Sequence, residues 1–422
     1  MLRYDSVNVT GSYQGKHVMK EHHYLDNAAT TWPKPEIVYT TMDEFFRGYG
    51  VNPGRAGHEL AVEAERMIVE TRRLLAEFFG FKGDTNRVVF TQNATDSLNT
   101  ALYGVLNDGD HVITTRLEHN AVIRPLNHMQ RDNRITVTSV SGDDPGFVDP
   151  ADIKRAITPA TRVIVVNHAS NVLGSVQDIA AIGRISREAG TLFIVDTCQS
   201  AGILPIDMDE IGIDILAFTG HKGLFGPMGI GGMVVRDGID VRPIRVGGTG
   251  VDSASRFQPD EYPFHLEAGT VALPGIAGLN AAQKWFARLG REQIDRAHAD
   301  LSHKDACRAG LEYISRIEHD HVQRLANAFR DVPGLTVYGP QDNQPRVATL
   351  SIGIDGMPAD QAGVMLDADY HVCVRTGLHC APLVHEDRGT VANNGTIRFA
   401  PGYFTEDDDV DQAILGVTEL AA

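Results

Sequence analysis

Short apolar runs alternate with amphipathic segments through the first half of the chain. Four of these runs are candidates for buried strands: residues 87–90, 111–114, 163–166 and 192–195. The segments between them have helical spacing, most clearly at 97–106 and 179–189. Strands that alternate with helices predict an α/β fold with a mostly parallel sheet, which helices cover on both faces.

The pattern changes in the second half of the chain. From about residue 278 to 325 the sequence predicts a long connecting helix with many charges on one face. Candidate strands around a helix near 359–366 then predict a small α+β domain. We therefore expect three parts: an N-terminal arm (1–23), a large domain (24–280, in which 24–50 is a candidate for packing on the small domain), and the connecting helix with the small C-terminal domain (281–422).

Composition narrows the function. The 422 residues are 42% hydrophobic, enough for one large core and a second, smaller one. The formal net charge of −17 repels phosphate backbones and anionic lipids, so we expect no nucleic-acid or membrane partner. Four scattered cysteines give no disulfide framework or CxxC spacing, and the polar N-terminus lacks the apolar core of a signal peptide. We therefore expect reduced thiols, no metal site and a cytoplasmic location.

A single lysine, Lys222, lies in the apolar, glycine-rich segment 214–231. Desolvation keeps part of a lysine's amine neutral, and the neutral amine is the form that attacks an aldehyde. An isolated lysine of this kind is more often a residue of a surface turn. The functional interpretation therefore depends on the residues around it.

Asp196 directly follows the apolar run 192–195. Ligands of parallel sheets bind beyond the carboxyl ends of the strands. A carboxylate there can keep a pyridinium nitrogen protonated, which makes the ring an electron sink. Alone, such an aspartate is more often a helix cap, but with Lys222 it forms the pair that pyridoxal 5'-phosphate requires.

Other strand-end residues suit the rest of this cofactor. Thr95 opens the helix predicted at 97–106, where a phosphate would be bound, and an N-capping role uses the same geometry. Thr219 and His221 flank the lysine as two further donors. His119 could stack on the ring and move protons, although an ordinary buried or surface histidine is the simpler interpretation for it alone.

The segment 375–382 carries the group that would select the reaction. Its thiol, Cys380, lies on a glycine-containing loop beside His379 and near Arg375, a positive setting that favours the nucleophilic thiolate. Eighteen positions further on, Arg398 offers a planar fork for a substrate carboxylate, and a structural salt bridge is equally compatible with it.

Together these stretches resemble the class V aminotransferase-type pyridoxal-phosphate enzymes, and within them the group of cysteine desulfurases that includes selenocysteine lyases. The similarity runs from Tyr24 to about Leu420. Its most specific marks are these segments: 24–31 (YLDNAATT), 118–120 (EHN), 171–174 (NVLG), Asp196 with Gln199, 220–222 (GHK), 267–270 (EAGT) and 375–381 (RTGLHCA).

The resemblance implies a fold type I transferase: a homodimer with active sites at the subunit interface. It implies that Thr270 reaches the phosphate of the neighbouring subunit's cofactor and that Gln199 bonds the ring oxygen. It also implies that Asn171 and Arg398 hold the substrate carboxylate. Three further positions complete the implied set: Ala94 for the cofactor, and Ala28 and Arg375 for the substrate.

In the implied reaction L-cysteine displaces Lys222, which then removes the α-proton, and Cys380 attacks the substrate's sulfur. Alanine leaves, and the persulfide on Cys380 passes to an acceptor protein or small thiol. The sequence departs at two positions from the better-known sulfur-mobilising members of the family: Gly54 stands where they commonly have a histidine, and Ala94 where they often have a second phosphate-binding threonine. These departures leave the substrate and the persulfide acceptor less defined than the cofactor.

Three alternatives remain at the level of sequence. A selenocysteine lyase would use the same pocket with L-selenocysteine and need not use Cys380, because selenium leaves more readily. An aminotransferase or another C–S lyase would rely on Lys222 alone, and pyruvate as product would favour it. A binding or scaffold protein would show no visible absorption band with pyridoxal phosphate.

Overall fold

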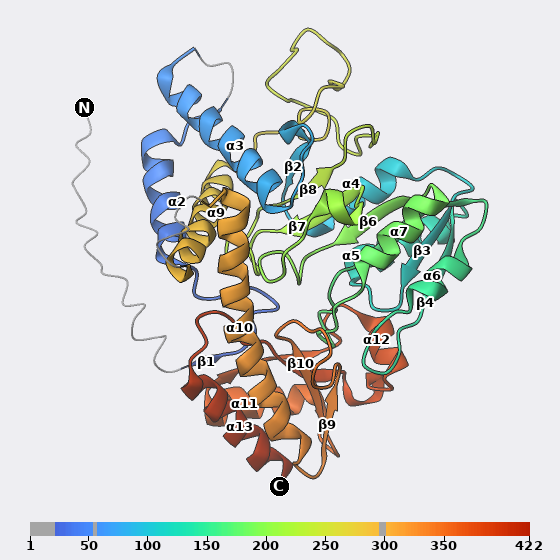
Figure 1. Ribbon diagram of the computed structural model, residues 1–422, viewed down its shortest axis with the longest axis vertical. Coiled ribbons are helices and arrows are strands. Elements are labelled where there is room, and N and C mark those ends of the chain that lie inside the picture. The colour runs from blue at the N-terminus through green and yellow to red at the C-terminus, as the bar shows by residue number, and fades with distance from the viewer. Residues whose placement is uncertain (1–21, 54–56, 295–300) are drawn as a thin grey trace, which may run out of the picture.

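The structure is a computed structural model that describes residues 22–53, 57–294 and 301–422. A large unit and a small unit are joined by the long helix α10 (His303–Arg330), which packs against elements of both (Figure 1). Most of the predicted N-terminal arm, and Gly54, lie outside the described residues. Among the described residues, every helix is too short or too polar to cross a membrane.

The large unit is built on a seven-stranded sheet in the order β2-β8-β7-β6-β5-β3-β4. Its strands are β2 (Val88–Thr91), β3 (His111–Thr115), β4 (Thr136–Val140), β5 (Thr161–Asn167), β6 (Leu192–Asp196), β7 (Ile215–Thr219) and β8 (Gly231–Val235). All neighbouring pairs are parallel except those made by β8, which runs antiparallel to β7 and β2. The prediction of a mostly parallel sheet is confirmed.

Alternation along the strands explains why both faces of this sheet are covered. In β5, Ile164 and Val166 face one apolar core, and Val163 and Val165 face the other. The helices of this unit are α2 (Glu36–Tyr49), α3 (Glu59–Phe78), α4 (Ala94–Val105), α5 (Asn120–Arg131), α6 (Pro150–Ala156), α7 (Ile179–Ala189), α8 (Met208–Ile211) and α9 (Leu273–Gln293), with the short 3-10 turn η1 (Thr85–Arg87).

The small unit has a four-stranded antiparallel sheet in the order β12-β13-β10-β9. Its strands are β9 (Leu335–Tyr338), β10 (Leu350–Ile354), β12 (Arg375–Gly377) and β13 (Thr396–Phe399). A separate parallel pair joins β1 (His23–Tyr24) to β11 (Val372–Cys373). The helical elements are α11 (Ala359–Tyr370), α12 (Pro382–Asp387), α13 (Asp407–Ala421) and the 3-10 turn η3 (Val391–Asn393). Residues of α10, α11, α13 and the sheet form its own apolar core.

Two elements differ from the expectation. Helix α4 begins at Ala94 rather than at residue 97, because the Asn93 side chain caps it by accepting the Asp96 N–H. The expected connecting helix is two helices, α9 and α10, with residues 295–300 between them outside the described chain.

We propose from these helices that the division between the units lies later than residue 280. That residue falls inside α9, which packs on α2 and α3 of the large unit. The N-terminal segment 24–50 contacts both units: β1 pairs with β11 of the small unit, whereas α2 packs on α9 of the large unit. We therefore propose α10 alone as the connector.

Candidate active site

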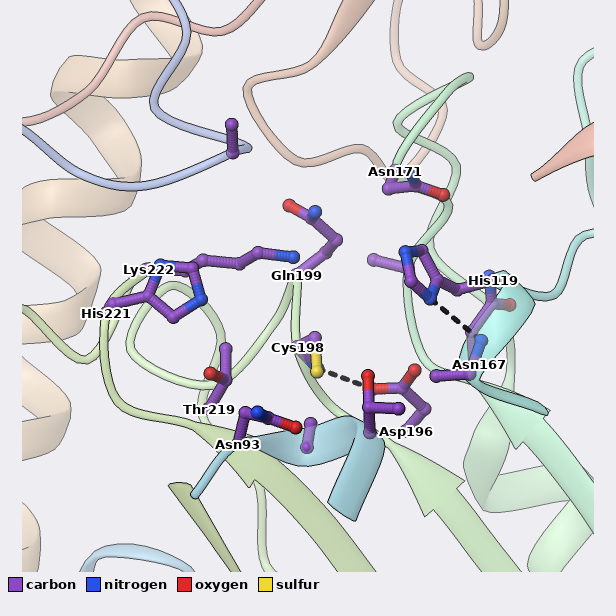
Figure 2. Close-up of a pocket in the computed structure, with 15 residues that line it drawn as sticks. Asn93, His119, Asn167, Asn171, Asp196, Cys198, Gln199, Thr219, His221 and Lys222 are labelled. Carbon is purple, nitrogen blue, oxygen red and sulfur yellow. Dashed lines mark hydrogen bonds between the residues drawn. The ribbon is translucent and has the colours of Figure 1, made fainter. Parts of the chain in front are cut away.

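A cavity of about 220 Å³ lies at the carboxyl ends of the central strands (Figure 2). Its walls come from the ends of β5, β6 and β7 and from the first residues of α4 and α5. The lining residues are Ala29, Asn93, Ala94, Thr95, His119, Ala121, Asn167, Ala169, Asn171, Asp196, Cys198, Gln199, Thr219, His221 and Lys222. Nine of the ten positions expected around the cofactor are in this set, and Thr270 is the exception.

Asp196 is the last residue of β6 and is 5% exposed. One carboxylate oxygen accepts a hydrogen bond of 2.9 Å from the Cys198 backbone N–H (Figure 2). The carboxylate has no other hydrogen-bond partner among the described residues. A buried carboxylate with a free oxygen can receive a protonated ring nitrogen.

Lys222 follows β7, and its amine points across the cavity toward Gln199 (Figure 2). The described residues give that amine neither a hydrogen bond nor an ion pair. The backbone beneath it is firmly held: the His221 carbonyl accepts from Thr30 Oγ1 at 2.9 Å, from the Thr31 N–H at 3.1 Å and from Lys34 Nζ at 2.8 Å. The Lys222 amine is therefore unpaired among the described residues, whereas the backbone that carries it is held in place by hydrogen bonds.

The first turn of α4 opens into the cavity as an anion site. The backbone N–H groups of Ala94 and Thr95 have no partners among the described residues, and they lie at the positive end of the helix dipole. Beside Asn93, Thr219 Oγ1 is buried and also lacks a described partner (Figure 2). Donors from two elements thus converge where the sequence placed a phosphate, and Asn93, not Thr95, is the N-cap.

His119 caps α5 and is held as a neutral imidazole. Its Nδ1 accepts the Ala121 N–H at 3.0 Å, which leaves the proton on Nε2. Burial lowers the pKa of His119 to about 4, against the opposing charge of Asp196. The ring is therefore uncharged near neutral pH, and Figure 2 shows it beside the cavity between Asn171 and Asn167.

Cys380 is not among the residues that line the cavity, and the strained loop of the small unit that carries it lies beside the cavity wall. His379 and Cys380 have φ of 48° and 59°, a left-handed conformation that costs about 1–3 kcal/mol at a non-glycine residue. Two hydrogen bonds from the large unit hold it: the Asn120 N–H donates to the Cys380 carbonyl at 2.7 Å, and Asn171 Nδ2 donates to the His379 carbonyl at 2.6 Å.

The positive charge beside the thiol comes from Arg375 and not from His379. Arg375 Nη2 lies 3.6 Å from Cys380 Sγ. His379 is buried, and its Nε2 instead contacts the carbonyl and hydroxyl oxygens of Thr396 at 3.1 and 3.0 Å. Burial holds the pKa of His379 well below its usual range, so the ring is neutral. The expectation that His379 adds to an electropositive setting is wrong for this reason.

Arg398 is 1% exposed and links three segments. Its Nη2 pairs with Asp26 Oδ1 at 2.8 Å, and its Nη1 donates to the Asn171 carbonyl at 3.0 Å. Burial lowers the pKa of Arg398, and Asp26 opposes that shift. The salt bridge considered at the sequence level is present, and it occupies part of the fork that a substrate carboxylate would use.

Several expected residues lie beside the cavity or away from it. Ala28 borders a small adjoining cavity, and its carbonyl accepts from Gln199 Nε2 at 3.0 Å. Thr270 is exposed and does not line the cavity of its own chain. Sequence reasoning gave no role to six lining residues: Ala29, Asn93, Ala121, Asn167, Ala169 and Cys198. The polar ones had a place near a strand end as their only signal, and the three alanines carry no chemical signal.

The buried carboxylic acid Glu118 lies directly before His119 and hydrogen-bonds to Thr115 and Asn167 beneath the cavity. Glu118 Oε1 accepts from Thr115 Oγ1 at 2.7 Å and from the Asn167 N–H at 3.0 Å, while Oε2 lacks a described partner. Burial raises the pKa of Glu118 to about 8, despite these hydrogen bonds. Glu118 is therefore protonated in the folded chain near pH 7.

This acid predicts a pH effect on stability. Between about pH 5 and 8 the folded chain retains a proton that the unfolded chain releases, so the free energy of unfolding falls as the pH rises. Glu118→Gln keeps the shape and removes the titration. We expect the parent to lose about 1 kcal/mol per pH unit relative to the variant across this range, measured by urea unfolding. Parallel pH profiles for the two proteins would contradict the assignment.

Comparisons with known proteins agree with this geometry. The sequence pattern of the family described as aminotransferase class-V matches residues 23–309 and 306–413. A probable cysteine desulfurase from Methanothermobacter thermautotrophicus is 31% identical over 95% of this chain and 94% of that protein. A cysteine desulfurase from Haloferax volcanii is 30% identical over 94% of this chain and 90% of that protein.

Solved structures show the same fold. The apo structure of a cysteine desulfurase from Thermococcus onnurineus superposes with a TM-score of 0.84, at 29% identity and 96% coverage of both chains. A cysteine desulfurase from Escherichia coli superposes with a TM-score of 0.80, at 26% identity and 95% coverage of both. The chain therefore belongs to the aminotransferase class-V family.

Proposed function

We propose that this protein is a pyridoxal-phosphate-dependent cysteine desulfurase, which converts L-cysteine to L-alanine and leaves a persulfide on Cys380. The observation that carries the proposal is the tethered loop. The large unit holds the Cys380 carbonyl at the start of α5, directly beside His119 of the cavity that contains Lys222 and Asp196. An aminotransferase would have no use for a thiol fixed there.

The residues of the cavity fit pyridoxal phosphate. Its phosphate suits the unpartnered N–H groups of α4 and the orphaned Thr219 hydroxyl. Its ring nitrogen suits the free oxygen of Asp196, and its aldehyde suits the unpartnered amine of Lys222. When bound, the cofactor supplies an electron sink for the pair of electrons left at the substrate's α-carbon.

The chain's own residues then have separate tasks. Lys222 is the base for the α-proton, because its amine is free and its backbone is fixed by Thr30, Thr31 and Lys34. His119, neutral with its proton on Nε2, packs beside the cofactor site and can donate that hydrogen without adding charge. Gln199 is kept at the wall by the Ala28 carbonyl.

Sulfur transfer is assigned to Cys380. The thiolate attacks the sulfur of bound cysteine, so an S–S bond forms while the C–S bond breaks. The electron pair of the broken bond stays with the carbon and takes up a proton, which gives alanine. Arg375 supplies a positive charge next to the attacking sulfur. This step needs a free thiol, and we therefore propose the reducing cytoplasm as the compartment.

The substrate carboxylate is assigned to Arg398 with Asn171. Both are buried at the junction of the units, and Arg398 already holds the Asn171 carbonyl. Asp26 must share the guanidinium with the substrate or release one edge of it. The acceptor of the persulfide is proposed only as a protein or small thiol that can reach the Cys380 loop.

We also propose a homodimer in which Thr270 completes the partner's cofactor site. Thr270 is exposed and lies outside its own chain's cavity, which supports a role toward a second chain. Equilibrium sedimentation is expected to give twice the chain mass of 45.9 kDa. A single-chain mass with full activity would contradict this arrangement.

The reaction itself is tested with cofactor-loaded protein, L-cysteine and a reductant. We expect equimolar alanine and sulfide from the parent and a loss of about 10²-fold or more in Cys380→Ala, because the attacking sulfur is gone. Cys307→Ser is the matched control, since that thiol is buried on α10 away from the cavity. Alanine, sulfide and pyruvate are quantified together.

Other outcomes move the assignment in defined ways. Pyruvate as product, or turnover that is indifferent to Cys380, would contradict desulfuration and leave a lyase or aminotransferase. If Cys380→Ala keeps cleavage of L-selenocysteine while losing that of L-cysteine, the dependence on the thiol is specific to sulfur.

A further inference from the structure

Three different metal-ligating side chains meet in the small unit, outside the cavity already described. The ligand atoms of His22, Asp367 and Cys373 all lie within 4.8 Å of one another. They come from the residue before β1, from the last turn of α11 and from β11. None of the three lines the active-site cavity, and the proposed reaction uses none of them.

Backbone hydrogen bonds fix the positions of this cluster. Strand β1 runs parallel to β11, with Tyr24 opposite Cys373. The His23 N–H donates to the His371 carbonyl at 2.8 Å, and the Leu25 N–H donates to the Cys373 carbonyl at 2.9 Å. The strand pairing thus brings His22 and Cys373 together, and Asp367 is placed beside them by the end of α11, where the His371 N–H donates to its carbonyl at 3.2 Å.

The ligand types select a class of metal. One sulfur, one imidazole and one carboxylate suit zinc and similar transition metals, whereas magnesium and calcium favour sites made of oxygen. Bonds of about 2.0–2.3 Å in a tetrahedral zinc site place ligand atoms roughly 3.3–3.8 Å apart. Closing the cluster from 4.8 Å therefore needs a movement of roughly 1 Å, within reach of side-chain rotation.

Two of the three side chains lack a protein partner among the described residues. His22 Nδ1 is buried without a hydrogen-bond partner, and the exposed Asp367 carboxylate makes no ion pair there. The His371 ring lies 5.9 Å from that of His22, edge to face, as a candidate fourth ligand.

We propose that His22, Asp367 and Cys373 bind one zinc ion, with water or His371 in the fourth position. The site lies at the base of both segments that the small unit brings to the active site. Strand β1 continues into Asp26, which pairs with Arg398. Strand β11 continues into β12, which carries Arg375 and leads to Cys380. The ion is thus structural: it clamps the start of the described chain to the strand that precedes the sulfur-carrying loop.

The test measures zinc on the full-length, cofactor-loaded protein after dialysis and addition of one equivalent of Zn²⁺. We expect about one zinc per chain in the parent and at least a tenfold weaker affinity in Cys373→Ser and in His22→Ala, since each loses a ligand. Asp369→Asn is the matched control, because Asp369 is exposed on the same helix and lies outside the cluster. It should bind zinc like the parent.

A spectroscopic measurement on Cys380→Ala protein identifies the ligand set directly. With Co²⁺ in place of zinc, we expect the strong visible bands of a tetrahedral site and a thiolate-to-cobalt charge-transfer band, which Cys373→Ser in the same background abolishes. Absence of that band, absence of zinc from the parent, or zinc binding that is unchanged by Cys373→Ser would each overturn the proposal.

Discussion

Burial of the Arg398 guanidinium is the constraint on which the candidate site depends. A buried cation is costly unless it is paired and hydrogen-bonded. Its carboxylate partner, Asp26, comes from the segment that follows β1, and its second contact, the Asn171 carbonyl, comes from the loop after β5. Asn171 in turn donates to the His379 carbonyl. One buried charge thereby ties the start of the described chain, the large unit and the Cys380 loop into a single arrangement.

This arrangement places the proposed cofactor chemistry and the proposed sulfur transfer on different parts of the chain. The cavity proposed to bind the cofactor is built from the ends of β5, β6 and β7 and the N-termini of two helices, all regular elements of the large unit. Cys380 instead sits on a loop of the small unit, in a left-handed conformation that the Asn120 and Asn171 hydrogen bonds maintain. We propose that strain held by a few hydrogen bonds allows the local movement that Cys380 would need to turn from substrate to acceptor as a sulfur carrier.

Much of this could be predicted from the sequence, because the carboxyl ends of parallel strands share one edge of a sheet. Helix α7 was predicted at 179–189 and is found there, and Asp196 and Lys222 both face the cavity. The orientation of His379 could not be predicted, since it depends on packing against Thr396, a contact between distant positions. The same holds for the cluster of His22, Asp367 and Cys373, whose first and last members are 351 positions apart and meet only through β1–β11 pairing.

The central claim is that Lys222 is the covalent attachment point of the cofactor, and one measurement tests it most directly. Borohydride reduction of the cofactor-loaded protein makes a linkage between lysine and cofactor permanent. The protein is then digested, and the masses of its peptides are measured by mass spectrometry. The account predicts one reduced cofactor per chain, on the peptide that contains Lys222. Attachment to another lysine such as Lys34, or release of all the cofactor on denaturation, would contradict it.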